Sequence, residues 1–125
     1  MTTATLTLTE FLLARIAEDE ATAQTGRNEY WRVEGGPSWT DDRPYELVGG
    51  GKHLATFDDD HGILPSIHIG RWSPARVLAE CEAKRRIVEG MQPYCPIDDI
   101  SAPEVLGYLA TPYADHPDYR EEWRP

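Results

Sequence analysis

The chain of 125 residues contains little cysteine and little positive charge. Its two cysteines are too few for a disulfide scaffold or for a complete thiolate zinc site. Only 12 basic residues stand against 22 acidic ones, which gives a formal net charge of −10. This balance argues against direct binding of duplex nucleic acid, because such binding uses Lys and Arg to displace counterions.

Long apolar runs are also missing. No segment approaches 18 consecutive apolar residues, so we expect no transmembrane helix and no membrane partner. The apolar patch Leu8–Ile16 has no basic stretch before it and runs directly into charged residues, unlike a signal peptide. These features favour a cytoplasmic protein in which Cys81 and Cys95 are free thiols.

The length predicts a single domain over residues 1–125. Hydrophobic residues make up 40% of the chain and charged residues 27%, as in a folded globular protein. A chain of this size buries roughly two-thirds of its unfolded surface, which is enough for one modest core.

Helical periodicity begins near the N-terminus. Thr7-Leu8-Thr9-Glu10 fits a capping box, in which the Thr and Glu side chains satisfy each other's backbone amides. Leu8, Phe11 and Ile16 then recur at helical spacing, and Gly26 is the expected end. This pattern predicts an N-terminal helix that packs on the core.

Two further helices are expected in the second half. Ser73-Pro74 predicts the start of a long helix over residues 74–89, with Ser as N-cap and Pro at the first helical position. Ser101–Glu104 forms a second capping box and opens a short helix that Pro112 ends. The segment from Tyr113 to Pro125 has no helical period, and we expect it to be a docked C-terminal tail.

Three segments between the first two helices are rich in β-formers. They are Tyr30–Val33, Tyr45–Val48 and Lys52–Phe57, and Gly49-Gly50-Gly51 between the last two is a hairpin signal. They predict a small three-stranded antiparallel sheet, so the expected fold class is α+β. We expect four side chains of the sheet to face the helices: Tyr45, Leu47, Leu54 and Trp31. Residues 65–72 fit either a fourth strand or a short helix.

Three segments together resemble a domain-of-unknown-function family, number 6221, found in actinobacteria and their phages. They are Leu8–Glu20, His68–Val88 and Tyr113–Pro125. The resemblance implies a phage or accessory-gene setting, and it implies no activity. A weaker resemblance to small phage proteins implies a short helix over residues 66–72, although Gly70 stands where such a helix usually has Ala.

The residues that could bind a metal or catalyse a reaction form no recognisable pattern, so we predict no catalytic residue, metal or cofactor. Gly49–Lys52 lacks the spacing of a phosphate-binding loop. The alternative that stays open is a small metal-dependent hydrolase or Cys/His enzyme built on His68, His116 and a cysteine. The candidates weighed are His53, His61, His68, His116, Asp58–Asp60, Cys81 and Cys95.

Two groups of residues are candidates for binding a partner. The first consists of four rings in the tail, Tyr113, His116, Tyr119 and Trp123, which either pack on their own domain or dock on another chain. The second is a basic run on the long helix. It is either a salt-bridged solvated face or a docking site for the acidic tail or an anionic partner. Its candidate contact residues are Arg76, Arg85 and Arg86.

These observations favour a small acidic protein-interaction module over an enzyme. The net negative charge favours a protein partner with a basic surface. A homodimer formed through the tail or the sheet edge is a further possibility that the sequence leaves open.

Overall fold

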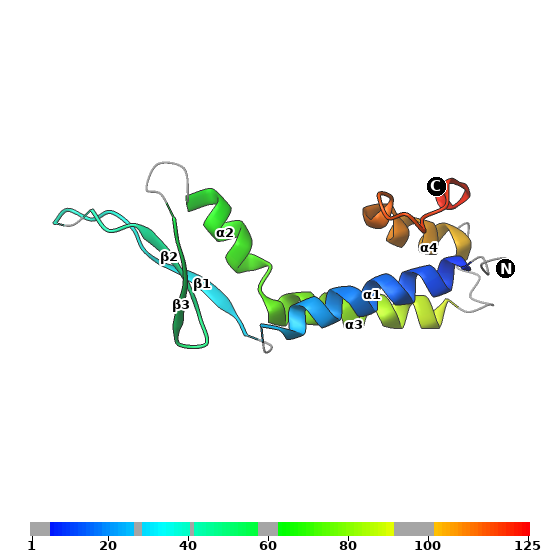
Figure 1. The fold of residues 1–125 in the computed structure, drawn as a ribbon, viewed down its shortest axis with the longest axis horizontal. Helices are drawn as coiled ribbons and strands as arrows, with labels where there is room; N and C mark the ends of the chain where they lie inside the picture. Colours follow the sequence, from blue (N-terminus) through cyan, green and yellow to red (C-terminus); the bar gives the residue numbers. More distant parts are fainter. Residues whose placement is uncertain (1–5, 27–28, 41, 58–62, 92–101) are drawn as a thin grey trace. The chain divides into compact units, whose positions relative to one another are not determined.

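A computed structural model describes the chain outside residues 1–5, 27–28, 41, 58–62 and 92–101. The described residues form an α+β fold, as predicted, and Figure 1 labels its elements. In chain order they are α1 (Leu8–Gln24), β1 (Trp31–Gly35), β2 (Tyr45–Gly49), β3 (Lys52–Phe57), α2 (Ile63–Arg71), α3 (Pro74–Gly90) and α4 (Ala102–Ala110), followed by the 3-10 turns η1 (Thr111–Tyr113) and η2 (Glu121–Trp123).

The chain divides into two compact units. Unit 1 combines Met1–Glu20 with Glu80–Pro125, and unit 2 is Ala21–Ala79. The helices α1 and α3 each contribute residues to both units. Unit 1 thus holds the tail and α4, whereas unit 2 holds the sheet and α2. That all 125 residues act as a single domain stays a prediction.

The sheet of unit 2 is the predicted antiparallel meander in the order β1-β2-β3. Gly50 and Gly51 connect β2 to β3 with φ values of +57° and +74°, the left-handed backbone that a tight hairpin turn requires. Opposite Gly49, the Trp31 ring lies where a side chain would otherwise project. The glycine triplet is therefore explained by the hairpin and by the close approach of Trp31.

A bulge in β3 changes the expected role of Leu54. Leu47 pairs with Ala55, but Val48 pairs with His53, so Leu54 has no cross-strand partner. Leu47 is buried as predicted, whereas Leu54 stays 41% exposed. The alternating pattern predicted that both side chains face the helices. The prediction for Leu54 was wrong because the pattern alone does not reveal a bulge.

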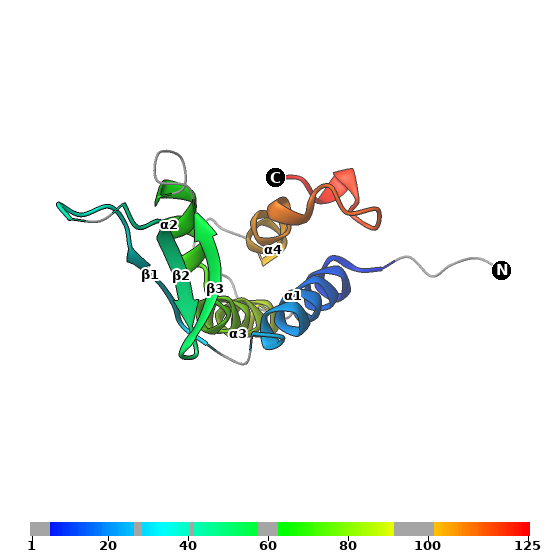
Figure 2. The same cartoon turned by 60° about the vertical axis from the view of Figure 1, so that its left-hand side comes forward.

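Residues 63–71 form the helix α2, which resolves the choice between helix and strand. Figure 2 shows α2 beside β1 and β2, and within residues 65–71 of the helix Ser66 and Gly70 are buried. A β-carbon at Gly70 would lie 3.5 Å from Leu47 Cδ1, an ordinary van der Waals distance. Gly70 therefore does not prevent the helix that the weaker resemblance implies.

The two predicted C-terminal helices are also present. The helix α3 begins at Pro74 as predicted and ends one residue later than predicted, at Gly90. The helix α4 spans Ala102–Ala110 and is followed by η1, which contains Pro112. Ser101, the expected N-cap of α4, lies outside the described residues. None of the described helices is long and apolar enough to span a bilayer.

The same substitution at Gly70 and at Gly49 should have opposite effects. Gly70→Ala adds a methyl group at ordinary contact distance and restricts the unfolded chain, so it should raise the free energy of unfolding by about 0.5–1 kcal/mol. Gly49→Ala forces the Trp31 ring to move and should lower it by about 1–3 kcal/mol. Denaturant unfolding of both variants checks the signs, and two changes of the same sign would contradict this packing.

Candidate functional site

The four tail rings surround Phe11 of α1. Phe11 is fully buried, and its ring centroid lies 5.1 Å from Trp123, 5.6 Å from His116, 6.0 Å from Tyr119 and 6.4 Å from Tyr113. Three of these pairs meet edge to face, a favourable arrangement for aromatic quadrupoles. We call Phe11 and these four rings the tail cluster. In this structure the tail is docked on its own chain.

Local sequence features bring the tail cluster together. The predicted capping box is present, since Glu10 N–H donates to Thr7 Oγ1 at 3.1 Å and Thr7 N–H donates to Glu10 Oε1 at 3.3 Å. This fixes the start of α1 at Leu8, three residues before Phe11. In the tail, successive tight turns are closed by amides that bond three residues back, including Tyr119 N–H to the His116 carbonyl at 2.9 Å. These turns place rings on Phe11 without a regular helix.

Gly107 of α4 allows the end of the tail to lie against the helix. A β-carbon at this position would lie 2.8 Å from the Trp123 carbonyl oxygen, which is closer than real β-carbons approach backbone oxygens. Glycine in a helix costs about 1 kcal/mol relative to alanine. The close contact with Trp123 explains why this position of the helix is glycine and not alanine.

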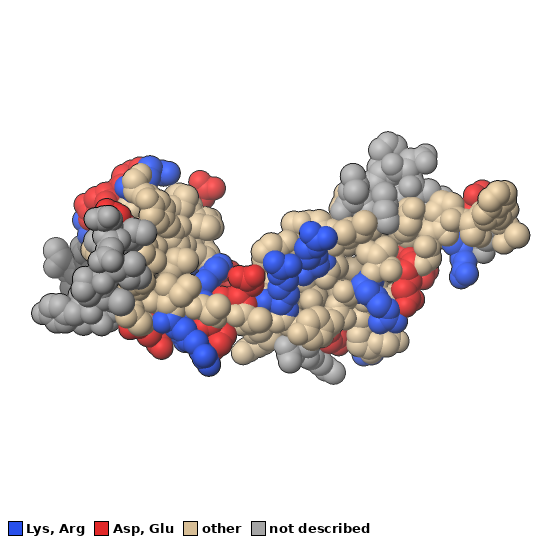
Figure 3. Space-filling view, turned by 180° about the vertical axis from the view of Figure 1, so that it is seen from behind, with Lys and Arg blue, Asp and Glu red and all other residues tan. Residues whose placement is uncertain are grey.

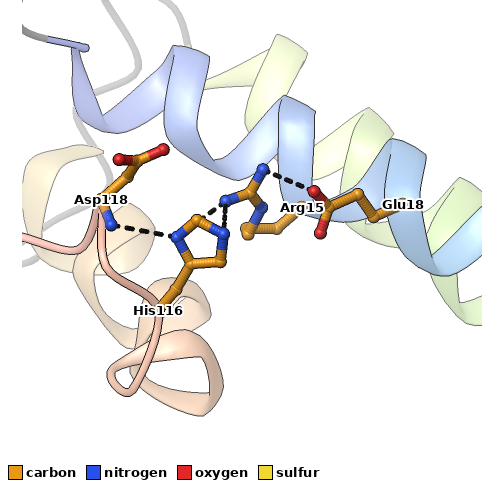
Figure 4. Close-up of polar contacts among 4 residues, drawn as sticks. All are labelled: Arg15, Glu18, His116 and Asp118. Carbon is orange, nitrogen blue, oxygen red and sulfur yellow. Dashed lines mark hydrogen bonds and ion pairs between the residues drawn. The ribbon is translucent and has the colours of Figure 1, made fainter.

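Arg15 is the buried cation of the tail cluster (Figure 4). It is 8% exposed, donates to Glu18 Oε1 at 2.9 Å and contacts the ring nitrogens of His116. Asp118 N–H also donates to His116 Nδ1, at 3.0 Å. Guanidinium and amide groups can only donate, and an imidazole has at most one acceptor nitrogen. Nδ1, which faces both Arg15 Nη1 and the Asp118 N–H, is therefore the acceptor. The position of His116 is therefore fixed by packing and hydrogen bonds.

Two ionisable groups, one in the tail cluster and one near it, are shifted toward their neutral forms. Burial and a 2.6 Å hydrogen bond to Asp19 Oδ2 raise the pKa of the Tyr113 hydroxyl. Burial and the nearby charge of Asp19 raise the pKa of the Cys81 thiol. A thiol with a raised pKa holds less reactive thiolate at neutral pH. This environment favours an inert Cys81 over a nucleophile.

The three arginine candidates have separate contacts. Arg85 pairs with Glu20, and Arg86 pairs with Glu82 at 2.9 Å, the latter being an ion pair that the i,i+4 spacing predicts. In unit 2, the Arg76 guanidinium lies 4.3 Å from the centroid of the Trp72 ring. On the face in Figure 3, acidic and basic side chains are interspersed. The ion pairs of Arg85 and Arg86 fit the salt-bridged alternative, and a role of the three arginines in partner binding stays a prediction.

The remaining chemical candidates lie apart or outside the described residues. His53 is exposed and bonds Thr56 at 2.8 Å, and His68 is exposed on α2. His61, Cys95 and Asp58–Asp60 fall in parts of the chain that the structure does not describe. Within the described residues, no group of three His, Cys, Asp or Glu side chains could hold a metal ion.

Sequence reasoning missed two features, one beside the tail cluster and one in unit 2. Phe11, Arg15 and Asp19 share one face of α1 at intervals of four residues, and this polar pair within an apolar stripe was the signal for a buried polar cluster. Trp39 is fully exposed in the connection between β1 and β2. Its position between Pro37 and other turn residues was the signal for an exposed loop ring.

These observations define an acidic α+β chain with an internally docked aromatic tail. The chain belongs to a family of unknown function, DUF6221, whose model matches residues 5–125. The match confirms the resemblance drawn from three segments and extends it across the sheet, which those segments did not include. No curated protein and no solved structure matches the chain.

The Tyr113–Asp19 bond should make stability depend on alkaline pH. Because the folded state raises the pKa of Tyr113, only the unfolded state loses this proton just above pH ~10, and the free energy of unfolding should fall as pH rises further. In Tyr113→Phe this part of the decline should disappear, while Tyr108→Phe, which alters an exposed ring, should keep it. Denaturant unfolding between pH 8 and 11 measures both, and parallel curves for all three proteins would refute the contribution.

Proposed function

We propose that this chain is a cytoplasmic protein-interaction module, in the actinobacterial or phage setting that the resemblance implies. One observation carries the proposal: exposed large hydrophobic side chains concentrate in unit 2. Six of the eight among the described residues lie there, namely Tyr30, Trp39, Leu54, Ile67, Ile69 and Trp72. Ile87 and Tyr108 are the two in unit 1.

Trp39 is the strongest single contact candidate. Its side chain is fully exposed on the hairpin connection that projects from β1 and β2 in Figure 1. Exposed aliphatic residues are common on folded proteins, but a fully exposed indole forgoes a large hydrophobic gain. Tryptophan is also enriched among the residues that contribute most to binding at protein interfaces. Insertion of this ring into a partner pocket would bury it.

The charges of the two units support a partner with a basic surface. Unit 1 contains 14 acidic and 6 basic residues, so its formal charge is −8, whereas unit 2 contains 8 acidic and 6 basic residues. The negative potential of unit 1 would attract a basic protein surface and repel the phosphate backbone of a duplex. Hydrophobic contact is thus proposed for unit 2 and electrostatic attraction for unit 1.

We assign the tail rings a lesser role in partner binding. Tyr113, His116, Tyr119 and Trp123 already contact Phe11, so offering them to another chain would first require breaking those contacts. The enzyme alternative gains no specific observation from the described residues, and it stays a prediction. Self-association remains a second possibility for an exposed ring such as Trp39.

Photo-crosslinking tests the proposal at Trp39. The full chain carrying benzoylphenylalanine at position 39 is irradiated in a lysate of the cells that encode it, and the same substitution at exposed Tyr108 is the matched control. We expect a discrete adduct from position 39, absent from position 108 and suppressed by excess unlabelled chain but not by its Trp39→Ser variant. An adduct of twice the chain mass would show that position 39 contacts a second copy of this chain and not a different protein. Equal adducts from both positions, or none from position 39, would refute the proposal.

A further inference from the structure

The strand β1 forms an edge of the sheet with open backbone groups. Gly36 N–H donates to the Pro44 carbonyl at 3.1 Å, so these opposed residues form a hydrogen-bonded pair. Such pairs alternate along an antiparallel ladder, and the register sets Gly35 opposite Tyr45, Val33 opposite Leu47 and Trp31 opposite Gly49. Trp31, Val33 and Gly35 therefore direct their N–H and C=O groups away from β2. Among the described residues, no hydrogen bond uses these outward groups.

A groove lies between this edge and α2. It has a volume of about 280 Å³ and is lined by Trp31, Arg32, Val33, Ile67, Gly70 and Arg71. The helix approaches the strand at Gly70, where a β-carbon would lie at an ordinary contact distance of 3.7 Å from the Trp31 carbonyl oxygen. Pockets for drug-sized ligands measure roughly 300–1,000 Å³. This groove is smaller, and its size suits one or two amino-acid side chains.

The groove combines an apolar wall with positive charge. Ile67 is 41% exposed and offers its side chain to an occupant. Arg71 makes no ion pair or hydrogen bond within the described residues. Arg32 pairs with Glu34 at 2.7 Å. Because both side chains are exposed, this ion pair contributes little to stability, and Arg32 can bind another carboxylate instead. The groove is thus a local cationic surface on an acidic chain.

We propose that the β1–α2 groove binds an extended acidic segment of a protein partner by strand addition. The segment pairs its backbone with Trp31, Val33 and Gly35 and places an aliphatic side chain against Ile67. Side chains two residues apart in a strand point to the same face, so an Asp or Glu at that spacing reaches Arg71. The expected motif is therefore an aliphatic residue, any residue, then Asp or Glu, in either chain direction.

This inference extends the proposed interaction function to a surface that does not include Trp39. A partner that binds both the groove and unit 1 would present an acidic strand to the groove and a basic face to unit 1. Binding at the groove and binding at Trp39 can each be lost while the other is retained, so the two proposals fail separately.

Selection from a random, internally displayed heptapeptide library on the full chain tests the groove. We expect enriched peptides with the aliphatic-x-acidic spacing, and the Trp39→Ser variant should enrich the same motif. The best peptide should shift the amide resonances of Trp31, Val33 and Gly35 in NMR titrations. Its N-methylated form, which blocks backbone pairing, should bind at least about tenfold more weakly.

A charge exchange tests the contact with Arg71. Arg71→Glu should weaken binding of the acidic peptide at least about tenfold and should improve binding of the same peptide with Lys at the acidic position. Arg86→Glu makes the same charge change on α3 in unit 1 and should leave both affinities unchanged. Failure to enrich this motif, amide shifts that miss β1, or equal effects of the two substitutions would each overturn the proposal.

Discussion

The packing of the C-terminal tail on Phe11 determines how unit 1 is built. Phe11 has no exposed surface, and truncating such a ring typically costs about 3–5 kcal/mol. Its aromatic neighbours come from residues about 100 positions later in the chain, so a local helix and a distant tail share one cluster. Arg15 and Asp19 extend the same face of α1 with hydrogen bonds to His116 and Tyr113. Loss of the central ring would release all of these contacts together.

This packing separates the aromatic residues into two groups with different roles. The tail rings contact their own chain, whereas Trp39 and Trp72 of unit 2 remain exposed. The most acidic part of the chain is unit 1, and the cationic groove lies in unit 2. The proposed interaction of unit 2 with a partner accounts for both distributions, because the half-buried tail rings already pack on Phe11 in unit 1. The chain belongs to the DUF6221 family, whose function is unknown, so the proposed partner is a question for experiment.

Signals that lie close together in the sequence predicted the fold well. The Thr7–Glu10 capping box, the Pro74 helix start and the Gly50-Gly51 turn are local, and each occurs where it was expected. Features set by distant residues were less accessible. The bulge at Leu54 depends on pairing with β2, and the choice of helix for residues 63–71 depends on packing beside β1. The sequence identified the tail rings as contact residues but not what they contact, because an aromatic ring suits an interface and a protein interior equally well. Their packing on Phe11 became visible only in the structure.

Fluorine NMR of the chain labelled with 5-fluorotryptophan tests most directly whether the tail belongs to the core of unit 1. The four tryptophan resonances can be assigned by single Trp→Phe variants and then exposed to a soluble paramagnetic probe. Packing on Phe11 predicts a Trp123 resonance displaced from the free amino acid and weakly broadened, with Trp39 near the free position and strongly broadened. A Trp123 resonance as solvent-like and as strongly broadened as that of Trp39 would contradict the docked tail.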